Sequence, residues 1–442
     1  MGLLLKGGTI VTGYPVSVFQ ADILIVDDRI ERVAPNIEIT SAEEFKVVDC
    51  SQMLITPGFV NGHIHLNQLL NRGFLEDVST EDLLQNMHAR HEKKSDDDRY
   101  WASLVSIYEG LRSGTTFFSA FATSSGRIGD AMIDAGVRGT LTVAKKDQWW
   151  GEGNPPPQKP TQQVLAGLQK QIEEWSSPTV TLSIGAASDR SASESLLRGL
   201  AQLASSTGVR LYIHTAEGSQ SVPLSLKYRN ARPVEFLSKI NFLQPYVTLV
   251  HASNITEYEI QLIADSGASV CHCPISNAKT VAGIMPLKLV RGAGIPVCLG
   301  TDAASTGNTN NILVEGYFAS ILHRALSGDA SFPPAEEVFA MLTVEGAKAV
   351  GFGGVLGEIR PGFKADVVLW NRTDSAFLPN AQNPIAGLIY CASEVRPERV
   401  YIDGALVYEK GPTRFDVNAG LKWLEAYARQ QSPNAKTSHG SI

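Results

Sequence analysis

Short apolar runs recur along the middle of the chain and alternate with segments of a different periodicity. The runs occupy 59–65, 115–121, 138–144, 179–187, 210–216, 246–252, 268–273 and 295–301. Continuous runs of this kind are typical of strands buried on both faces. Most of the intervening segments place apolar residues three and four positions apart, as in 99–113, 195–206, 256–266 and 311–325, which is the spacing of an amphipathic helix. This alternation predicts an α/β fold, a closed (β/α)8 TIM barrel.

The two ends of the chain show another pattern. Residues 3–12 and 22–33 near the start, and 365–370 and 400–408 near the end, have the length and β-rich composition of hairpin strands. We therefore expect a small composite β-sandwich domain formed from 1–56 plus 357–415, and a barrel over 57–356. The segment 416–442 is expected to form a C-terminal helix and a disordered tail.

Composition narrows the function. The chain has 442 residues, of which 43% are hydrophobic and 19% charged, which fits a globular protein with a large core. The formal charge is −7, and no run of Lys or Arg exceeds two residues, so nothing supports binding to nucleic acid. No apolar stretch approaches the ~20 residues of a membrane span. The five cysteines lack CxxC spacing, and no signal-peptide pattern opens the chain, so we expect a cytoplasmic protein.

Candidate chemistry lies at the ends of the predicted barrel strands. The first strand ends in Gly62-His63-Ile64-His65, an arrangement that points both imidazoles to the same side. The fifth ends in His214 with Glu217 three residues later, the sixth in His251 and the eighth in Asp302. Active sites of such barrels lie at this end of the strands. A single histidine there is often only structural, but histidines and a carboxylate from four strands together predict a site for Zn²⁺ or Fe²⁺.

The residues around these positions resemble a known family. The segment 57–65 (PGFVNGHIH) is similar to the opening motif of the amidohydrolase superfamily, and the likeness extends to GFKAD at 362–366. The segment 65–73 (HLNQLLNRG), with Ser276-Asn277 and Gly300-Thr301-Asp302, resembles its deaminase/chlorohydrolase branch. That branch includes S-adenosylhomocysteine and methylthioadenosine deaminases, guanine deaminases and s-triazine hydrolases.

The resemblance implies a set of metal ligands. It assigns His63, His65, His214 and Asp302 to one divalent ion per subunit, Zn²⁺ or Fe²⁺, with His251 beside it. Binuclear members carry a carboxylated lysine at the end of strand four, and the corresponding segment 180–188 has no lysine, so one ion is expected. The resemblance also implies a homo-oligomer.

It further implies catalytic roles. A bound Zn²⁺ or Fe²⁺ supplies a nucleophile at neutral pH by lowering the pKa of water to about 7. Asp302 would take a proton from the water, and His251 would hold the water or stabilise the oxyanion. Glu217 would protonate the ring nitrogen beside the carbon under attack, a general acid effect of ~10²–10⁴-fold. The structural alternative for Glu217 is a solvated residue at the start of a helix.

Other residues are candidates for substrate binding. Gln68 and Arg72 follow the first histidine pair, and Ser276 and Asn277 follow strand seven. Trp149 could stack on a flat ring. Each has a structural alternative: Arg72 as a loop anchor, Ser276-Asn277 as a turn, Trp149 as a residue that holds a long loop. Four further histidines are expected to lie on the surface or in structural positions: His88, His91, His272 and His323.

Three functions compete. The leading one is hydrolytic deamination of an amino-substituted N-heterocycle (purine, pterin, pyrimidine or s-triazine), with release of ammonia. The alternative keeps the mononuclear metal site and changes the leaving group to chloride, an alkylamine or the amine side of a urea or amide. A catalytically inactive scaffold is the third, and the intact set of candidate ligands speaks against it. The expected partners are therefore a small heterocyclic substrate and water.

Overall fold

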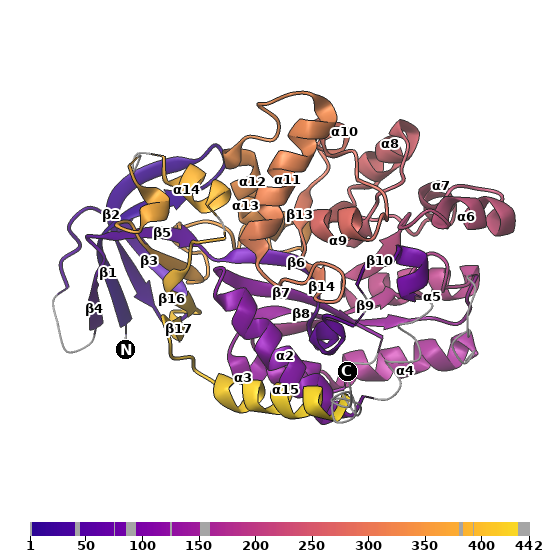
Figure 1. The fold of residues 1–442 in the computed structure, drawn as a ribbon, viewed down its shortest axis with the longest axis horizontal. Helices are drawn as coiled ribbons and strands as arrows, with labels where there is room; N and C mark the ends of the chain where they lie inside the picture. The colour runs from indigo at the N-terminus through magenta and orange to yellow at the C-terminus, as the bar shows by residue number, and fades with distance from the viewer. Residues whose placement is uncertain are drawn as a thin grey trace, which may run out of the picture.

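The computed structural model describes residues 2–39, 45–74, 76–84, 94–123, 126–150, 160–379, 383–391 and 393–431. In this part of the chain the strands form two sheets that lie side by side, as Figure 1 shows. One is a parallel barrel from the middle of the chain, and the other is a mostly antiparallel sheet built from both ends. The expected (β/α)8 barrel with a β domain from the two termini is confirmed.

The barrel strands follow one another in space in the order of the sequence. They are β6 (Phe59–His65), β7 (Thr115–Ala122), β8 (Arg138–Lys145), β9 (Val180–Ala186), β10 (Leu211–Thr215), β11 (Val247–His251), β12 (Ser269–His272), β13 (Val297–Leu299) and β14 (Asp302–Ala303). All neighbouring pairs are parallel. The eighth strand is split: β13 pairs with β12, and β14 pairs with β6. The split strand closes the barrel and sets Asp302 directly beside the histidine pair on β6.

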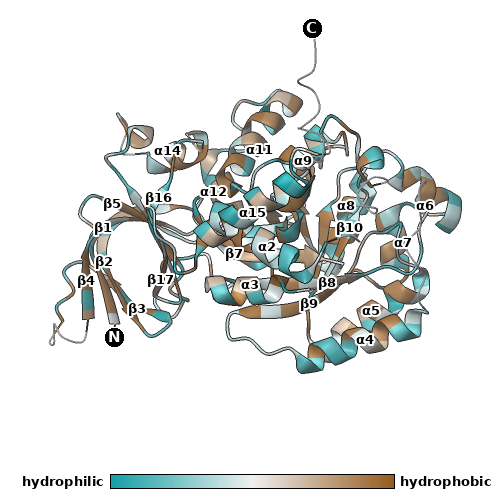
Figure 2. Ribbon diagram, turned by 60° about the horizontal axis from the view of Figure 1, so that its bottom comes forward, coloured by the Kyte–Doolittle hydropathy of each residue, from teal (hydrophilic) through white to brown (hydrophobic). Residues whose placement is uncertain are grey.

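Helices cover the barrel and connect its strands. They are α2 (Asp96–Leu111), α3 (Ile128–Ala135), α4 (Thr161–Glu174), α5 (Glu194–Thr207), α6 (Ser221–Arg229), α7 (Pro233–Lys239), α8 (Glu257–Ser266), α9 (Pro274–Lys279), α10 (Leu287–Gly292), α11 (Ile312–Ser327), α12 (Ala335–Leu342) and α13 (Val344–Ala349). Figure 2 shows hydrophilic and hydrophobic patches on α4 and α5. The residues that α5 buries are three or four positions apart, from Leu196 through Leu200 to Ala204, so one stripe of the helix faces the strands.

The second sheet has the order β17-β16-β15-β5-β1-β2-β3, with β4 beside β1. Its strands are β1 (Gly2–Thr12), β2 (Ser17–Val26), β3 (Arg29–Ala34), β4 (Phe45–Asp49), β5 (Met53–Pro57), β15 (Val367–Asn371), β16 (Pro397–Ile402) and β17 (Ala405–Glu409). Strands from opposite ends of the chain meet where β5 pairs antiparallel with β15. The sheet has its own apolar core, which includes Ile10, Ile23 and Val367. We keep 1–56 plus 357–415 and 57–356 as our proposed domain boundaries.

The remaining elements complete the C-terminal part. They are the short helix η1 (Leu66–Asn71) after β6, η2 (Ser375–Phe377), α14 (Pro384–Tyr390) and α15 (Val417–Gln431). Helix α15 lies along α2 in Figure 1, and its Trp423 packs near Val105 and Leu69. The tail expected to be disordered, 432–442, lies outside the described residues.

A buried ion pair joins the two sheets. Arg138, at the start of β8, is bidentate to Asp366 with distances of 2.8 and 3.1 Å, and it also contacts Asp403. Asp366 also accepts a hydrogen bond from the backbone of Asp403. Both partners of the Arg138–Asp366 pair are at most 5% exposed, so the pair anchors the second sheet to the bottom of the barrel.

Candidate metal centre and active site

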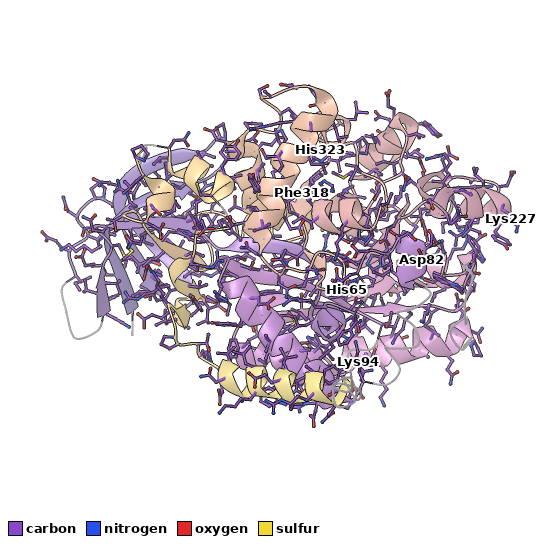
Figure 3. All side chains as sticks on the ribbon, in the orientation of Figure 1. His65, Asp82, Lys94, Lys227, Phe318 and His323 are labelled. Carbon is purple, nitrogen blue, oxygen red and sulfur yellow. The ribbon has the colours of Figure 1, made fainter. Side chains whose placement is uncertain are left out.

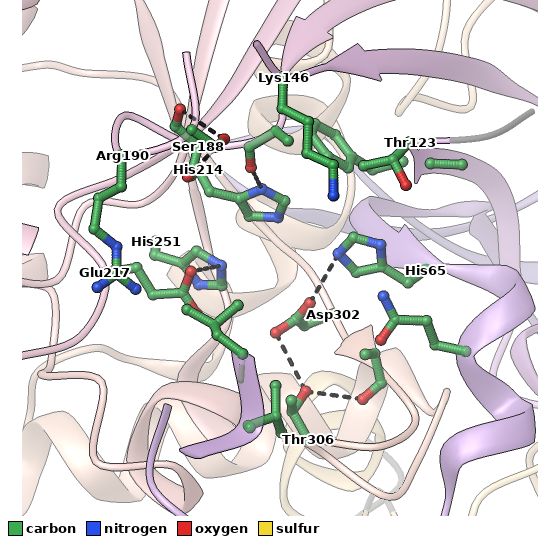
Figure 4. Close-up of a pocket in the computed structure, with 18 of the residues that line it drawn as sticks. His65, Thr123, Lys146, Ser188, Arg190, His214, Glu217, His251, Asp302 and Thr306 are labelled. Atoms are coloured by element: carbon green, nitrogen blue, oxygen red, sulfur yellow. Dashed lines mark hydrogen bonds and ion pairs between the residues drawn. The ribbon is translucent and has the colours of Figure 1, made fainter. Parts of the chain in front are cut away.

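The two histidines of β6 point to the same side of the strand, as the alternation predicts. The Nε2 atoms of His63 and His65 are 3.2 Å apart, and each is within 3.4 Å of Asp302 Oδ1. A close approach of strands requires the glycine before them, because a Cβ on Gly62 would lie 2.3 Å from the sulfur of Cys298. The motif therefore combines a packing requirement with the display of two imidazoles, of which Figure 4 labels that of His65.

Strands β10 and β11 bring two more imidazoles to the same place. His214 Nε2 lies 3.1 Å from His63 Nε2, while its Nδ1 is 2.6 Å from the carbonyl oxygen of Ala187. This second contact places the donated proton on Nδ1 and directs the lone pair of Nε2 to the centre. The ring of His251 stacks on that of His214 at 5.2 Å, and its Nδ1 is 3.2 Å from the amide of Asn277.

Backbone conformation at this end of the barrel is unusual. His251 has φ of +71° and Asp302 has φ of +57°, both in the left-handed region that costs of order 1 kcal/mol or more for a residue with a side chain. Such conformations persist where the surrounding structure holds them, and they cluster at functional sites. Here they turn both side chains into the mouth of the barrel.

The electrostatics of this cluster favour a cation at its centre. Burial lowers the pKa of all four imidazoles, that of His214 to about 4 and that of His63 far below its ordinary value. Burial alone would raise the pKa of Asp302, but the contact with His63 and the neighbouring rings outweigh it, so the carboxyl stays ionised. Neutral imidazoles and an ionised carboxylate are the forms that bind a metal.

Geometry agrees with this chemistry. One ligand atom from each of His63, His214, His251 and Asp302 lies within 4.8 Å of the other three, and His65 Nε2 lies beside them. His63 Nε2 lies 3.2 Å from His65 Nε2 and 3.1 Å from His214 Nε2, which brings together nitrogen ligands of the kind that Zn²⁺ binds. The donor set fits one divalent ion.

Glu217 lies next to this cluster. Its Oε2 is 3.5 Å from His251 Nε2, and its side chain is 20% exposed. Burial is the largest effect on the carboxyl and raises its pKa to about 7, with the nearby Asp302 acting in the same direction and His214 against it. A carboxyl with this pKa exchanges a proton near neutral pH, as a general acid must.

These groups open into a cavity of about 270 Å³, drawn in Figure 4. Among the residues that line it are His65, Gln68, Phe121, Lys146, Trp149, Asp189, Arg190, His214, Glu217, His251, Asp302 and Thr306. The sequence-predicted residues Gln68 and Trp149 are therefore at the cavity. Ser305 donates a 3.3 Å hydrogen bond to Gln68 Oε1, and Arg190 lies over the Trp149 ring at 5.3 Å, so both side chains are held in place.

Three expected substrate contacts are not at the cavity. Arg72 is bidentate to Glu109 at 2.8 and 2.6 Å, which is the loop-anchoring alternative. Ser276 donates a 2.5 Å hydrogen bond to Asp302 Oδ2, and Asn277 holds His251. Neither of these two is among the lining residues, because α9 begins directly after β12 and turns them beneath the site. In this structure Ser276 therefore supports Asp302 and Asn277 supports His251, and their contact with substrate stays a prediction.

Sequence reasoning missed Asp189 and Arg190, which follow β9 and line the cavity. Arg190 donates a 2.8 Å hydrogen bond to Glu81, and its side chain is 4% exposed. The rule that led to the other residues, polar groups at strand ends, applies equally to these two.

The other histidines fall into two groups. His272 Nε2 is 3.0 Å from His323 Nε2, a buried pair between β12 and α11, so the structural alternative is confirmed for both. Figure 3 shows His323 on its helix well away from His65. His88 and His91 lie outside the described residues. None of the helices in the described ranges is both long and apolar enough to cross a membrane.

Comparisons with known proteins agree with the fold and the site. A model of the amidohydrolase family matches residues 54–407. The 5-methylthioadenosine/S-adenosylhomocysteine deaminase of Pyrococcus furiosus is 30% identical over 410 residues, covering 92% of this chain and 96% of that protein. The structure superimposes on a zinc-bound adenosine deaminase from Xanthomonas campestris with a TM-score of 0.87 and 23% identity, covering 97% and 98% of the two chains.

A further solved structure with the same fold is atrazine chlorohydrolase from Arthrobacter aurescens TC1 complexed with zinc. The TM-score is 0.86 at 23% identity, and the match covers 96% of this chain and 99% of that one. At this identity the likeness of the two structures shows the fold alone.

Proposed function

Because the chain belongs to the amidohydrolase family, it is a metal-dependent hydrolase of carbon–nitrogen bonds other than peptide bonds, and we propose that its reaction is the hydrolytic deamination of an amino-substituted N-heterocycle. The observation that carries the proposal is the position of Glu217 at the wall of the cavity, with its Oε2 3.5 Å from His251 Nε2 and its pKa raised to about 7 by partial burial. Of the purine, pterin, pyrimidine and s-triazine rings that fit this chemistry, a purine is favoured by the deaminases among the relatives.

We propose His63, His65, His214 and Asp302 as ligands of one divalent ion, Zn²⁺ or Fe²⁺, with His251 beside them. When bound, such an ion lowers the pKa of water and stabilises negative charge on oxygen. The zinc-bound relatives favour Zn²⁺. The absence of lysine from β9, where residues 180–186 read VTLSIGA, supports a single ion.

The side chains divide the proton transfers between two carboxyls. Asp302 Oδ2 accepts hydrogen bonds from Ser276 and Thr306, which leaves Oδ1, at the centre of the cluster, to take the proton of the attacking water. Protonated Glu217 donates its proton to the ring nitrogen adjacent to the carbon attacked. That carbon becomes tetrahedral. Asp302 passes the proton taken from water to the amino group, which leaves as ammonia, while the hydroxyl proton returns to Glu217 and the oxygen of water stays on the ring as a carbonyl.

The alternative leaving groups, chloride, an alkylamine or the amine side of a urea or amide, use the same site. Chloride leaves as a weak base and needs a proton on a ring nitrogen less than an amine does, whereas release of an alkylamine needs it as much as release of ammonia. A raised pKa at Glu217 therefore favours an amine over chloride as the leaving group, since it keeps the acid protonated near pH 7.

We also propose that the enzyme acts in the cytoplasm as a homo-oligomer, and that its partners are the heterocycle and water, with no nucleic acid or membrane. The acidic net charge of −7 supports the absence of nucleic acid, and the sparse cysteines support the cytoplasm. Light scattering of the purified protein gives the oligomeric state.

A panel of aminopurines, aminopterins, aminopyrimidines, chlorotriazines and alkylaminotriazines tests the reaction. The zinc-loaded protein is incubated with each compound, and ammonia, chloride and alkylamine are measured separately. We expect ammonia from at least one amino-substituted ring. If chloride or alkylamine is released and no compound of the panel yields ammonia, the deaminase proposal is contradicted and the alternative is supported.

A further inference from the structure

One buried carboxylate at the cavity has no part in the reaction described above. Asp189 follows β9 and is 3% exposed, yet it lines the same cavity as Glu217. A buried carboxylate is costly unless its oxygens find hydrogen-bond donors. The hydrogen-bond donors to each of the two carboxylate oxygens of Asp189 therefore indicate its role.

Among the described residues, the donors to its side chain all use one oxygen. Asp189 Oδ2 accepts from the backbone N–H of Ala216 at 2.9 Å and from the hydroxyl of Ser221 at 2.8 Å. No donor among the described residues reaches Oδ1. The backbone N–H of Asp189 itself donates to the carbonyl of His214. The carboxylate is thus held against the loop that carries Glu217, and its Oδ1 has no donor in the part of the chain that the structure describes.

From this geometry we propose that Asp189 determines specificity: Oδ1 accepts a hydrogen bond from a ring N–H of the substrate, so the enzyme selects aminopurines that carry such a donor, with guanine as the type compound. The inference rests on the proposed deaminase function and adds the substrate class to it. Guanine has ring N–H groups, whereas the ring of an adenine nucleoside offers only acceptor nitrogens. If Asp189 Oδ1 faces a ring nitrogen that is itself an acceptor, both atoms lose their hydrogen bonds to water and gain none, which lowers the affinity for that ring. The enzyme would therefore discriminate against the adenine nucleoside.

The ribose hydroxyls of an adenine nucleoside are the other donors that could reach Oδ1. The two sources respond differently when the acceptor is changed. A hydroxyl can donate or accept, whereas a ring N–H only donates. A substitution that replaces the acceptor Oδ1 by a donor therefore lowers activity selectively toward the aminopurine that binds through a ring N–H.

Asp189→Asn makes that change with little alteration of shape. The backbone N–H of Ala216 needs an acceptor, so the single amide oxygen of Asn takes the position of Oδ2, and the NH₂ group faces the cavity. Ser221→Ala is the matched control, because it removes one hydrogen bond to Oδ2 and leaves the acceptor at the cavity in place.

The experiment measures kcat/KM for ammonia release from guanine and from 5′-methylthioadenosine with the wild type and both variants, all loaded with zinc. We expect the wild type to prefer guanine. In Asp189→Asn we expect the guanine-to-nucleoside ratio to fall roughly 10- to 100-fold, the effect of losing a hydrogen bond to a charged group, while Ser221→Ala keeps the wild-type ratio. A general loss of folding lowers both rates and cancels in the ratio.

A wild type that prefers the nucleoside, or an Asp189→Asn variant that loses both activities equally, would overturn the role of Asp189 and leave the deaminase function standing. Absence of ammonia release by the wild type from every amino-substituted ring would contradict the proposed function itself, and the inference with it.

Discussion

Replacement of Glu217 by glutamine removes the proposed general acid and keeps the size of the side chain. Burial raises the pKa of Glu217 from 4.5 to about 7. At pH 7 about half of the enzyme then carries the protonated carboxyl, whereas an ordinary glutamate would be protonated in only about 1 molecule in 300. The environment of the cavity therefore increases the fraction of enzyme with a protonated Glu217 roughly 150-fold at pH 7.

The amide of Glu217→Gln can still donate a hydrogen bond to the ring nitrogen but cannot transfer a proton. We expect kcat for ammonia release to fall by ~10²–10⁴-fold, with KM changed much less, because binding contacts remain. The wild type needs the protonated form, so its kcat/KM should decrease as the pH rises above about 7. The variant should lack this decrease.

Steady-state ammonia release between pH 5 and 9, with metal content measured for each preparation, checks both expectations. His214→Ala is a useful comparison, because it should lose metal, whereas Glu217→Gln should retain it. A Glu217→Gln enzyme that works at the full rate would refute the role given to this residue.

Three further predictions follow from neighbouring contacts. Ser276→Ala removes the 2.5 Å hydrogen bond to Asp302 Oδ2 and should lower kcat about tenfold; an unchanged pH profile and kcat would show that Ser276 does not support Asp302. Arg72→Ala should change kcat/KM less than about threefold, because Arg72 does not line the cavity; a large rise in KM would restore it as a substrate contact. Arg138→Met leaves Asp366 buried without its partner and should lower the free energy of unfolding by about 3–5 kcal/mol, measured as a lower urea midpoint, and an unchanged midpoint would show that this pair does not anchor the second sheet.

The barrel was predictable because a buried parallel strand leaves a strong signal in the sequence. The predicted run 115–121 became β7 (Thr115–Ala122), and 138–144 became β8 (Arg138–Lys145). The eighth strand was the exception. The run 295–301 predicts one strand, but the chain forms β13 and then β14, with Gly300 between them. A Cβ on Gly300 would lie 2.8 Å from the carbonyl oxygen of His63. A pattern of apolar residues does not report such close approaches.

The residues that point into the barrel mouth were predictable from strand ends, and His63 and Asp302 meet as the closed barrel requires. Side chains on the loops beyond the strands were harder. Ser276 and Asn277 lie only a few residues past β12, yet the immediate turn into α9 decides that they face the site from below. Asp189 also follows a barrel strand, but its contacts with Ala216 and Ser221 form only in the folded chain.

The most direct test of the account is a metal titration of the chelator-treated enzyme with an aminopurine that the wild type deaminates. Zn²⁺ is added in steps, and the rate of ammonia release is measured with the bound metal per chain. The account predicts no activity without metal, a linear rise, and a plateau at one ion per chain that His63→Ala fails to reach. Full activity after the metal has been removed, or a plateau only at two ions per chain, would contradict it.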